Sequence, residues 1–430
     1  MPASNTPSAP SIFPVLLVNF IGMLGYSIVI PILVFLVNRF GGNEFIYGLL
    51  GSIYPAFQLL GAPVLGRWSD EVGRKRVLII SQAGTFLAWL VFILALLIPN
   101  EAFMEVDSSF FGSFLISLPL ILLFLARALD GLTGGNVSVA NAYLSDVSTD
   151  ENRKANYGKM GSSTSLGFII GPVLAGILGA TFLGELLPVI VAALISLTAL
   201  LIINFYLPES RPELVPTDWK DLQTKKLFQI ENKECYSREK CTDMRLGSLL
   251  RNPRISLLYS IYFLTFLGFS FYYAGFPIYA STQLGWGTGQ LGIFFAVFSG
   301  IMVIFQGPVL SYLSDKIDGA WLVLIGSLLI GISFFLFPIG SSLSVWIAVF
   351  FLSSGNGIMW PSYMAILAET GSKENQGTIQ GYANSMGSLA SIFGLVLGGI
   401  LFGVVGPQIF YIAGFFLLLI FFLSFRLLKQ

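Results

Sequence analysis

Residues 66–76 read Gly-Arg-Trp-Ser-Asp-Glu-Val-Gly-Arg-Lys-Arg, a short charged stretch between two long apolar runs at about 45–65 and 77–98. Each run reaches the roughly 20 residues with which an α-helix crosses the hydrocarbon core of a bilayer. The stretch is therefore interpreted as a tight basic loop between two membrane-spanning helices. It decides the fold class, because the same alternation of apolar run and polar loop continues along the chain.

The composition of the chain agrees with a membrane protein. Of its 430 residues, 55% are hydrophobic and only 11% are charged, and the mean hydropathy is +0.80. Soluble domains carry about 25% charged residues, so a water-exposed globular protein is excluded. The formal net charge is zero, which argues against a nucleic-acid partner. We therefore expect a protein whose main solvent is the lipid bilayer.

Several residue types on which enzymes rely are missing or isolated. The chain has no histidine, no phosphate-binding loop and no nucleophile beside a base, so the sequence indicates neither an enzyme nor a metal or cofactor site. Its two cysteines, Cys235 and Cys241, match no zinc or redox spacing. They lie in the longest polar segment, where we expect reduced cytosolic thiols.

Twelve apolar runs are long enough to cross a bilayer, so we predict an all-α membrane protein with twelve transmembrane helices. The predicted spans are 12–37, 45–65, 77–98, 114–141, 157–179, 186–206, 255–280, 288–312, 320–339, 343–367, 379–403 and 407–427. They fall six and six on either side of one long polar stretch. This division predicts an N-terminal half at 1–207, a cytosolic linker at 208–254 and a C-terminal half at 255–430.

The basic residues predict how the chain is oriented. Of the 23 Lys and Arg residues, Arg127 lies within a span, and Arg39 alone lies in an outer loop if the N-terminus is cytosolic; the other 21 then face the cytosol. Cytosolic loops of membrane proteins carry such an excess. We therefore expect a multi-pass protein of the plasma membrane, here a bacterial inner membrane, with both termini in the cytosol.

The two halves share short sequence echoes. Pro63-Val-Leu and Ser69-Asp70 recur at one constant offset as Pro308-Val-Leu and Ser314-Asp315. Because each half has an even number of predicted spans, both copies have the same orientation in the membrane. The echoes therefore predict two parallel halves related by an axis along the membrane normal.

Three motifs occur in order along the first half. The first is the loop at 66–76, the second runs from Arg127-Ala-Leu-Asp130-Gly131 to Asn136 in the fourth span, and the third spaces small residues along the fifth span. The third motif consists of Gly158, Gly167, Gly171, Pro172 and Gly176. With these motifs the sequence resembles the major facilitator superfamily, and more narrowly the twelve-span drug/proton antiporters that include tetracycline efflux proteins.

The resemblance implies roles for the first and third motifs. The gating residues of the loop would be Gly66, Asp70, Gly73, Arg74 and Lys75. Asp70 would lie near the cytosolic N-terminus of the eleventh span, whose helix dipole attracts an anion. The small residues of the fifth span would form a tight seam between the halves that limits proton leak. The alternatives are membrane anchoring by the basic loop and ordinary glycine packing.

Arg127 and Asp130 are the charged side chains that we expect within the hydrocarbon. An ionised group at that depth costs at least about 2.5–3.5 kcal/mol on insertion scales, so it needs a partner or a water-filled cavity. Three positions apart on one helix, the two can pair. We interpret Asp130 as the carrier of a transported proton and Arg127 as the group that stabilises its carboxylate; the alternative is a permanent structural ion pair. The related efflux proteins usually have an acid in the first span, where Gly22 stands here.

Polar and aromatic residues inside the spans indicate where a substrate would bind. The resemblance implies that spans 1, 4, 7 and 10 face a central cavity. On these spans the candidates are Asn19, Asn136, Tyr272, Tyr273, Asn356 and Trp360. A wide, aromatic and weakly polar pocket suits an amphipathic organic solute, although each residue could serve only in helix packing.

Together these features predict a secondary active transporter that exports an amphipathic small molecule in exchange for protons by alternating access. The expected partners are the small-molecule substrate, protons and membrane lipid, and we expect a monomer. A proton-coupled or facilitative importer is the alternative, which the missing acid of the first span favours and the third motif opposes. A receptor or scaffold would not need a buried pair such as Arg127 and Asp130.

Overall fold

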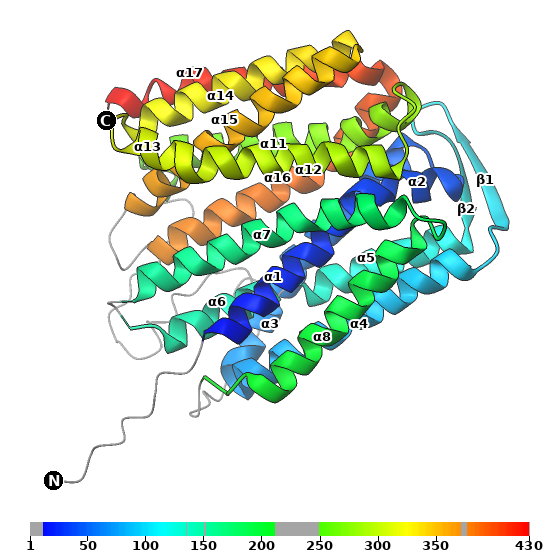
Figure 1. The fold of residues 1–430 in the computed structure, drawn as a ribbon, viewed down its shortest axis with the longest axis horizontal. Helices are drawn as coiled ribbons and strands as arrows, with labels where there is room; N and C mark the ends of the chain where they lie inside the picture. Colours follow the sequence, from blue (N-terminus) through cyan, green and yellow to red (C-terminus); the bar gives the residue numbers. More distant parts are fainter. Residues whose placement is uncertain (1–11, 135, 150–151, 211–248, 371–375, 430) are drawn as a thin grey trace.

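The computed structural model describes residues 12–134, 136–149, 152–210, 249–370 and 376–429, which are almost entirely helical (Figure 1). The first half forms α1 (Phe13–Ile28), α2 (Ile30–Arg39), α3 (Glu44–Val72), α4 (Arg74–Leu97), α5 (Leu118–Thr133), α6 (Asn136–Val147), α7 (Arg153–Gly179) and α8 (Leu186–Tyr206). The second half forms α11 (Pro253–Thr282), α12 (Thr288–Ile304), α13 (Leu310–Ser314), α14 (Gly319–Leu336), α15 (Ser342–Glu369), α16 (Gln376–Val405) and α17 (Ile409–Ser424). Most of the predicted linker, with both cysteines, lies outside the described residues.

The described helices confirm the class of an all-α membrane protein. Eleven helical segments of the described residues are long and apolar enough to cross a membrane. The last of them, Ile379–Ser424, is 46 residues long and contains both α16 and α17, which a short turn at Gly406–Gln408 separates. The number of twelve spans therefore stays a prediction, because α16 and α17 lie within one helical segment.

Three predicted spans contain a break in the helix. The first divides into α1 and α2 at Val29, two residues before Pro31, and the eighth continues from α12 to α13 through a π-helical segment around Pro308. Proline removes a backbone donor and crowds the preceding turn, which disturbs the regular ladder. The fourth span divides into α5 and α6 after Gly134, whose N–H bonds the carbonyl of Asp130 at 2.6 Å.

The predicted start of the fourth span at 114 is wrong. Residues before the helix form an antiparallel hairpin of β1 (Ala102–Ser108) and β2 (Gly112–Ser117), which the sequence did not predict. The helix begins only at Leu118, because the Ser117 side chain caps it and Pro119 occupies its first turn. The hairpin packs on the loop before α3, where the Leu115 N–H bonds the Gly41 carbonyl at 2.8 Å.

The helices form two bundles with the same internal pairings. In the first, α1 packs on α7 and α8, α4 on α8, and both α3 and α4 on α5. In the second, α11 packs on α16 and α17, α14 on α17, and both α12 and α14 on α15. The pairings match span for span, as the predicted parallel repeat requires. Between the bundles, α3 packs on α16 and α7 on α12.

Contacts between the two bundles are tightest near the hairpin, at the end of the molecule opposite the chain termini (Figure 1). A side chain on Gly176 would place its Cβ 2.5 Å from the Cα of Gly292, and one on Gly48 would meet the Leu395 carbonyl and Gly399. Only glycine allows helices to approach this closely. We call this end the hairpin end and the opposite one the termini end.

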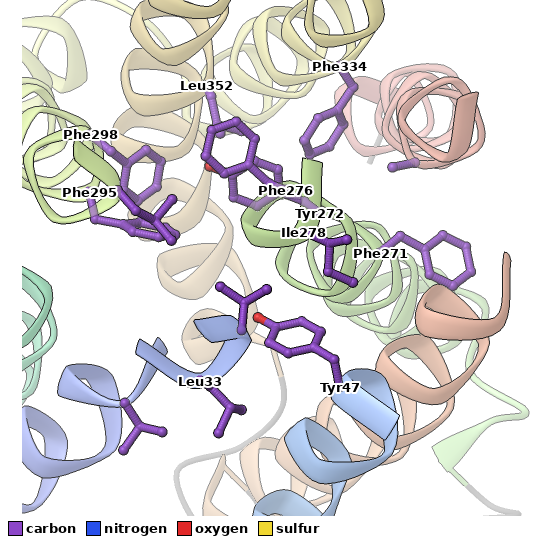
Figure 2. Close-up of a cluster of buried hydrophobic side chains, with 14 of the residues drawn as sticks. Leu33, Tyr47, Phe271, Tyr272, Phe276, Ile278, Phe295, Phe298, Phe334 and Leu352 are labelled. Carbon is purple, nitrogen blue, oxygen red and sulfur yellow. The ribbon is translucent and has the colours of Figure 1, made fainter. Parts of the chain in front are cut away.

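Aromatic and aliphatic side chains fill the same region of the interface. Figure 2 shows Tyr47 of the first bundle beside Ile278 of α11, with Leu33 of α2 on the side of Tyr47 away from α11. The Tyr47 hydroxyl donates to the backbone carbonyl of Tyr273 at 3.1 Å. The hairpin end of the interface is thus closed by packed side chains and touching backbones.

Candidate functional site

Arg127 and Asp130 lie on one face of α5, as predicted, and both are buried, with exposed fractions of 4% and 8%. Nη1 of Arg127 lies 3.6 Å from Oδ2 of Asp130. That distance is longer than the 2.7–2.9 Å of a strong charge-assisted hydrogen bond. The pair is therefore loose, although both charges are out of water.

Arg127 turns toward two tyrosines on neighbouring helices. Its guanidinium carbon lies 4.8 Å from the ring centre of Tyr54 on α3 and 5.8 Å from that of Tyr26 on α1. The two rings are 4.8 Å apart. A cation over an aromatic face gains about 0.5–2 kcal/mol, more when both are desolvated. The guanidinium is thus held by the tyrosines as well as by Asp130.

Asp130 turns the other way, toward α4. It lies near Thr85, whose hydroxyl is 3.3 Å from that of Thr133. A small cavity opens beside the carboxylate among α1, α4, α5 and α8. It is lined by Ile21, Gly22, Gly25, Tyr26, Gln82, Thr85, Trp89, Asp130, Ala192 and Ser196. Gly22, the position of the missing acid, therefore borders the same space as Asp130.

The charged loop forms a compact cluster around Arg74 at the termini end. The Arg74 side chain is fully buried, and its Nε donates to Oδ2 of Asp146 at 2.9 Å. Its Nη2 pairs with the carboxylate of Asp70, one turn earlier. Arg74 thus bridges α3 and α6 from the start of α4, which a simple membrane anchor would not do.

Glu209, just after α8, caps the start of α4. Its carboxylate accepts the backbone N–H groups of Arg74 at 2.9 Å and Lys75 at 3.1 Å, where the helix dipole favours an anion. Gly73 has φ +102°, and a Cβ there would lie 2.5 Å from Oε2 of Glu209. These two facts explain why glycine precedes the basic run. Sequence reasoning missed Glu209; its place at the very end of a span was the available signal.

Two other expectations for the loop have different outcomes. A Cβ on Gly66 would lie 3.5 Å from the Ser138 hydroxyl, an ordinary contact, so the approach of α6 to α3 does not require glycine at this position. The predicted meeting of Asp70 with the start of the eleventh span involves residues 371–375, which lie outside the described residues. That meeting stays a prediction.

The small residues of the fifth predicted span divide between two neighbours. Gly167 and Gly171 pack against the backbone and side chains of α1, inside the first bundle. Gly176 meets Gly292 of the second bundle, and Pro172 lies within α7 between these contacts. Gly158 has no atom within 4 Å of a Cβ placed on it. Of the five, Gly176 lies at the seam between the halves.

The family model of the major facilitator superfamily matches residues 15–394, with a second match at 258–430. The chain belongs to the major facilitator superfamily. Members of this superfamily are membrane transporters and not enzymes. The chain is therefore a multi-pass integral membrane transporter of small molecules, as its apolar helices indicate.

Named relatives and solved structures extend this finding. This transporter is 24% identical over 390 residues to the tetracycline resistance protein, class D, of Salmonella ordonez, covering 90% of this chain and 88% of the relative. It is 26% identical over 420 residues to multidrug resistance protein 2 of Bacillus subtilis (strain 168), covering 94% and 92%. The human organic anion transporter MFSD10 has TM-score 0.65 at 21% identity, covering 98% of this chain and 100% of that one. A D-xylose-proton symporter has TM-score 0.72 at 14% identity and 96% coverage of both chains, and these structures confirm the fold.

In this major facilitator, several predicted substrate residues contact neighbouring helices, and their role in binding stays a prediction. Asn19 is buried, and its amide donates to the Thr164 hydroxyl at 2.6 Å, which joins α1 to α7. The Asn356 amide lies 3.2 Å from the sulfur of Met302 on α12. Tyr272 is fully buried among the aromatic rings of the second bundle. Asn136 begins α6, and its side chain is not among those described.

Tyr273 lies at the interface of the bundles, where its carbonyl accepts from Tyr47, whereas Trp360 contacts rings of its own bundle. Trp360 is partly exposed, with its ring 5.3 Å from Tyr262 and 5.8 Å from Tyr363. The Tyr262 hydroxyl donates to Oδ1 of the exposed Asn384 at 2.7 Å. Tyr273 is partly buried and lies against Phe295. Sequence reasoning did not connect Tyr262 with Trp360, because α11 and α15 meet only in the fold.

Proposed function

We propose that this transporter exports an amphipathic small molecule in exchange for protons by alternating access, and that Asp130 carries the proton. The observation that carries the proposal is the position of Arg127, which lies beside Asp130 and over the rings of Tyr54 and Tyr26. One cation is therefore shared between a carboxylate that can take a proton and an aromatic surface that a solute can occupy.

This sharing can couple the two ligands. A solute that lies against Tyr26 and Tyr54 displaces the guanidinium, which then moves onto the Asp130 carboxylate. Close contact with a cation stabilises the ionised carboxylate, so Asp130 releases its proton. When Asp130 is protonated, the guanidinium returns to the rings and excludes the solute. Proton and solute then bind in turn, as an antiporter requires.

The basic loops and the named relatives support a direction and a location for transport. We propose that the termini end faces the cytosol of a bacterial cell, because the basic residues concentrate there. The Arg74 cluster then forms the inner gate, and the seam of Gly176 with Gly292 forms the outer one. Relatives named for resistance to tetracycline and to multiple drugs support export of an amphipathic compound. We further propose that the chain works as a monomer.

Reconstituted vesicles with an imposed pH gradient test the proposal. We expect wild-type protein to accumulate an amphipathic fluorescent substrate against its gradient, and Asp130→Asn to lose accumulation while still exchanging substrate down a gradient. Accumulation by wild-type protein when protons flow into the vesicles, rather than out of them, would indicate a proton-coupled importer instead.

Accessibility to an impermeant thiol reagent tests the orientation. Glu101 lies between α4 and β1 at the hairpin end and is exposed. In a background without native cysteines, Glu101→Cys should react in whole cells. In wild-type protein, Cys235 and Cys241 should not react. Labelling of the native cysteines from outside would invert the orientation.

A further inference from the structure

A polar contact joins the two bundles at the hairpin end, beside the glycine seam. Thr288, the first residue of α12, donates its hydroxyl at 3.3 Å to Oε1 of Glu185, which lies between α7 and α8. Thr288 is only 8% exposed, and Glu185 is partly buried. The donor belongs to the second bundle and the acceptor to the first, so the contact has to break whenever the two bundles separate at this end.

The helices that carry this contact pack closely where they adjoin. The end of α7 and the start of α12 lie side by side across the interface of the bundles (Figure 1). A Cβ on Gly179 would lie 2.6 Å from Cγ2 of Thr288, and one on Gly289 would lie 3.1 Å from Cβ of Ala180. These contacts continue the seam of Gly176 to the last turn of α7.

Glu185 is the one charged residue in the two chain segments that meet here, residues 180–187 and 283–290, so neither segment supplies a lysine or arginine to neutralise it. The start of α12 offers a partner instead, because the first N–H groups of a helix have no partner within that helix and the helix dipole attracts an anion. Gly287, before α12, has no side chain to cap these groups, whereas Ser341 caps α15. The Glu185 carboxylate is therefore placed to stabilise the start of a helix of the opposite bundle.

We propose that Glu185 is a latch of the outer gate. Its contact with Thr288 and with the start of α12 favours the state closed at the hairpin end, which is the state of this structure. When the bundles separate, water replaces both partners of the carboxylate, so the net free energy of the latch is small and the gate can reopen. The inference rests on the alternating access of the proposed function, and it adds a charged residue to the glycine seam of the outer gate.

Labelling of a cysteine behind the gate measures how often the gate opens. Ile278 is 3% exposed and lies beside Tyr47 in the interface (Figure 2). In whole cells whose protein carries Ile278→Cys and no native cysteine, the rate of a slow reaction with an impermeant maleimide is proportional to the open fraction. Glu185→Gln keeps the acceptor oxygen and removes the charge, and Thr288→Val keeps the shape and removes the donor. Each should raise the rate roughly 2- to 5-fold, the range expected for a charge at a helix N-terminus.

Three further variants make the result specific. Glu101→Gln is the matched control, because this carboxylate is exposed at the same end, between α4 and β1, and its loss should leave the rate unchanged. Thr288→Ser keeps the hydroxyl and should label like the parent. Glu185→Gln combined with Thr288→Val should label about as fast as either single variant, because both changes break one contact. Unchanged rates in both single variants, or equal rates for Thr288→Ser and Thr288→Val, would overturn the latch.

These outcomes are independent of the proton carrier. Labelling needs neither a substrate nor an imposed pH gradient, so the latch can fail while Asp130→Asn still loses accumulation as proposed. Accumulation by wild-type protein that ignores the pH gradient would overturn the exchange with protons, and the labelling rates would still decide whether Glu185 holds the outer gate.

Discussion

The guanidinium carbon of Arg127 lies 4.8 Å from the ring centre of Tyr54, within the range of a cation–π contact. The same side chain reaches Asp130 at 3.6 Å. Because one cation contacts both partners, a change at the Tyr54 ring should change how strongly Arg127 stabilises the Asp130 carboxylate. The site is therefore best tested by variants that alter one partner at a time.

Replacing Tyr54 separates the ring face from the hydroxyl. Tyr54→Phe keeps the ring and should keep substrate binding, whereas Tyr54→Leu loses the face that a solute shares with Arg127. A loss of about 0.5–2 kcal/mol corresponds to binding roughly 2- to 30-fold weaker. Equilibrium binding to purified protein measures the difference. Equal affinity of the two variants would remove the ring from the binding site.

A carboxylate at Gly22 should replace the one at Asp130. Both residues line one cavity, so an acid on α1 can reach the same space as the acid on α5. In the Asp130→Asn background, Gly22→Asp should restore part of the proton-driven accumulation. Gly22→Asn, of the same shape without the charge, is the control and should restore none. Equal results for the two would mean that position rather than charge matters.

The Arg74 cluster should separate gating from stability. Asp70→Asn keeps the shape of the side chain and leaves Asp146 paired, so we expect slow transport with near-normal folding. Arg74→Ala leaves partly buried carboxylates without their cation, which typically costs about 3–5 kcal/mol, so little folded protein should remain. Thermal unfolding and transport of the purified variants distinguish these effects. Normal turnover of Asp70→Asn would reduce the loop to a stabilising cluster.

Two glycines of one motif should respond differently to the same change. A Cβ on Gly176 meets the backbone of Gly292 at the hairpin end, whereas one on Gly158 meets nothing within 4 Å. Overpacking of this kind costs about 1–3 kcal/mol, so Gly176→Ala should favour states open at the hairpin end by roughly 5- to 150-fold. Labelling of a cysteine introduced near that seam reports the shift. Gly158→Ala should label like the parent, and identical labelling of both variants would contradict a closed seam at Gly176.

The fold was predictable where apolar length alone decides the structure. The long runs became helices close to their predicted bounds because an α-helix satisfies its own backbone groups in lipid. The predicted start of the fourth span at 114 was wrong because residues 114–116 are as apolar as the residues of a membrane-spanning helix. Only their pairing with β1 shows that they form a strand. Such pairing depends on residues that sequence periodicity over a short window does not connect.

Candidate site residues could be predicted from the sequence where burying their side chain in the membrane costs free energy. A charge in a span demands a reason, so Arg127 and Asp130 were identified from their type and position. Asn19 stays a prediction as a substrate residue; its amide bonds a neighbouring helix, here α7. The contacts of Arg127 with Tyr26 and Tyr54, and the capping of α4 by Glu209, join residues far apart in the sequence, so no local sequence pattern predicts them.

Ligand-induced proton release measures the central claim most directly. Purified protein in weak buffer at constant pH is mixed with tetracycline or another amphipathic compound, and a pH dye records the change. We predict that wild-type protein releases protons as it binds the compound, and that Asp130→Asn binds the compound without releasing any. Release by Asp130→Asn equal to that of wild-type protein would contradict the account, because the exchanged proton would then reside on another group.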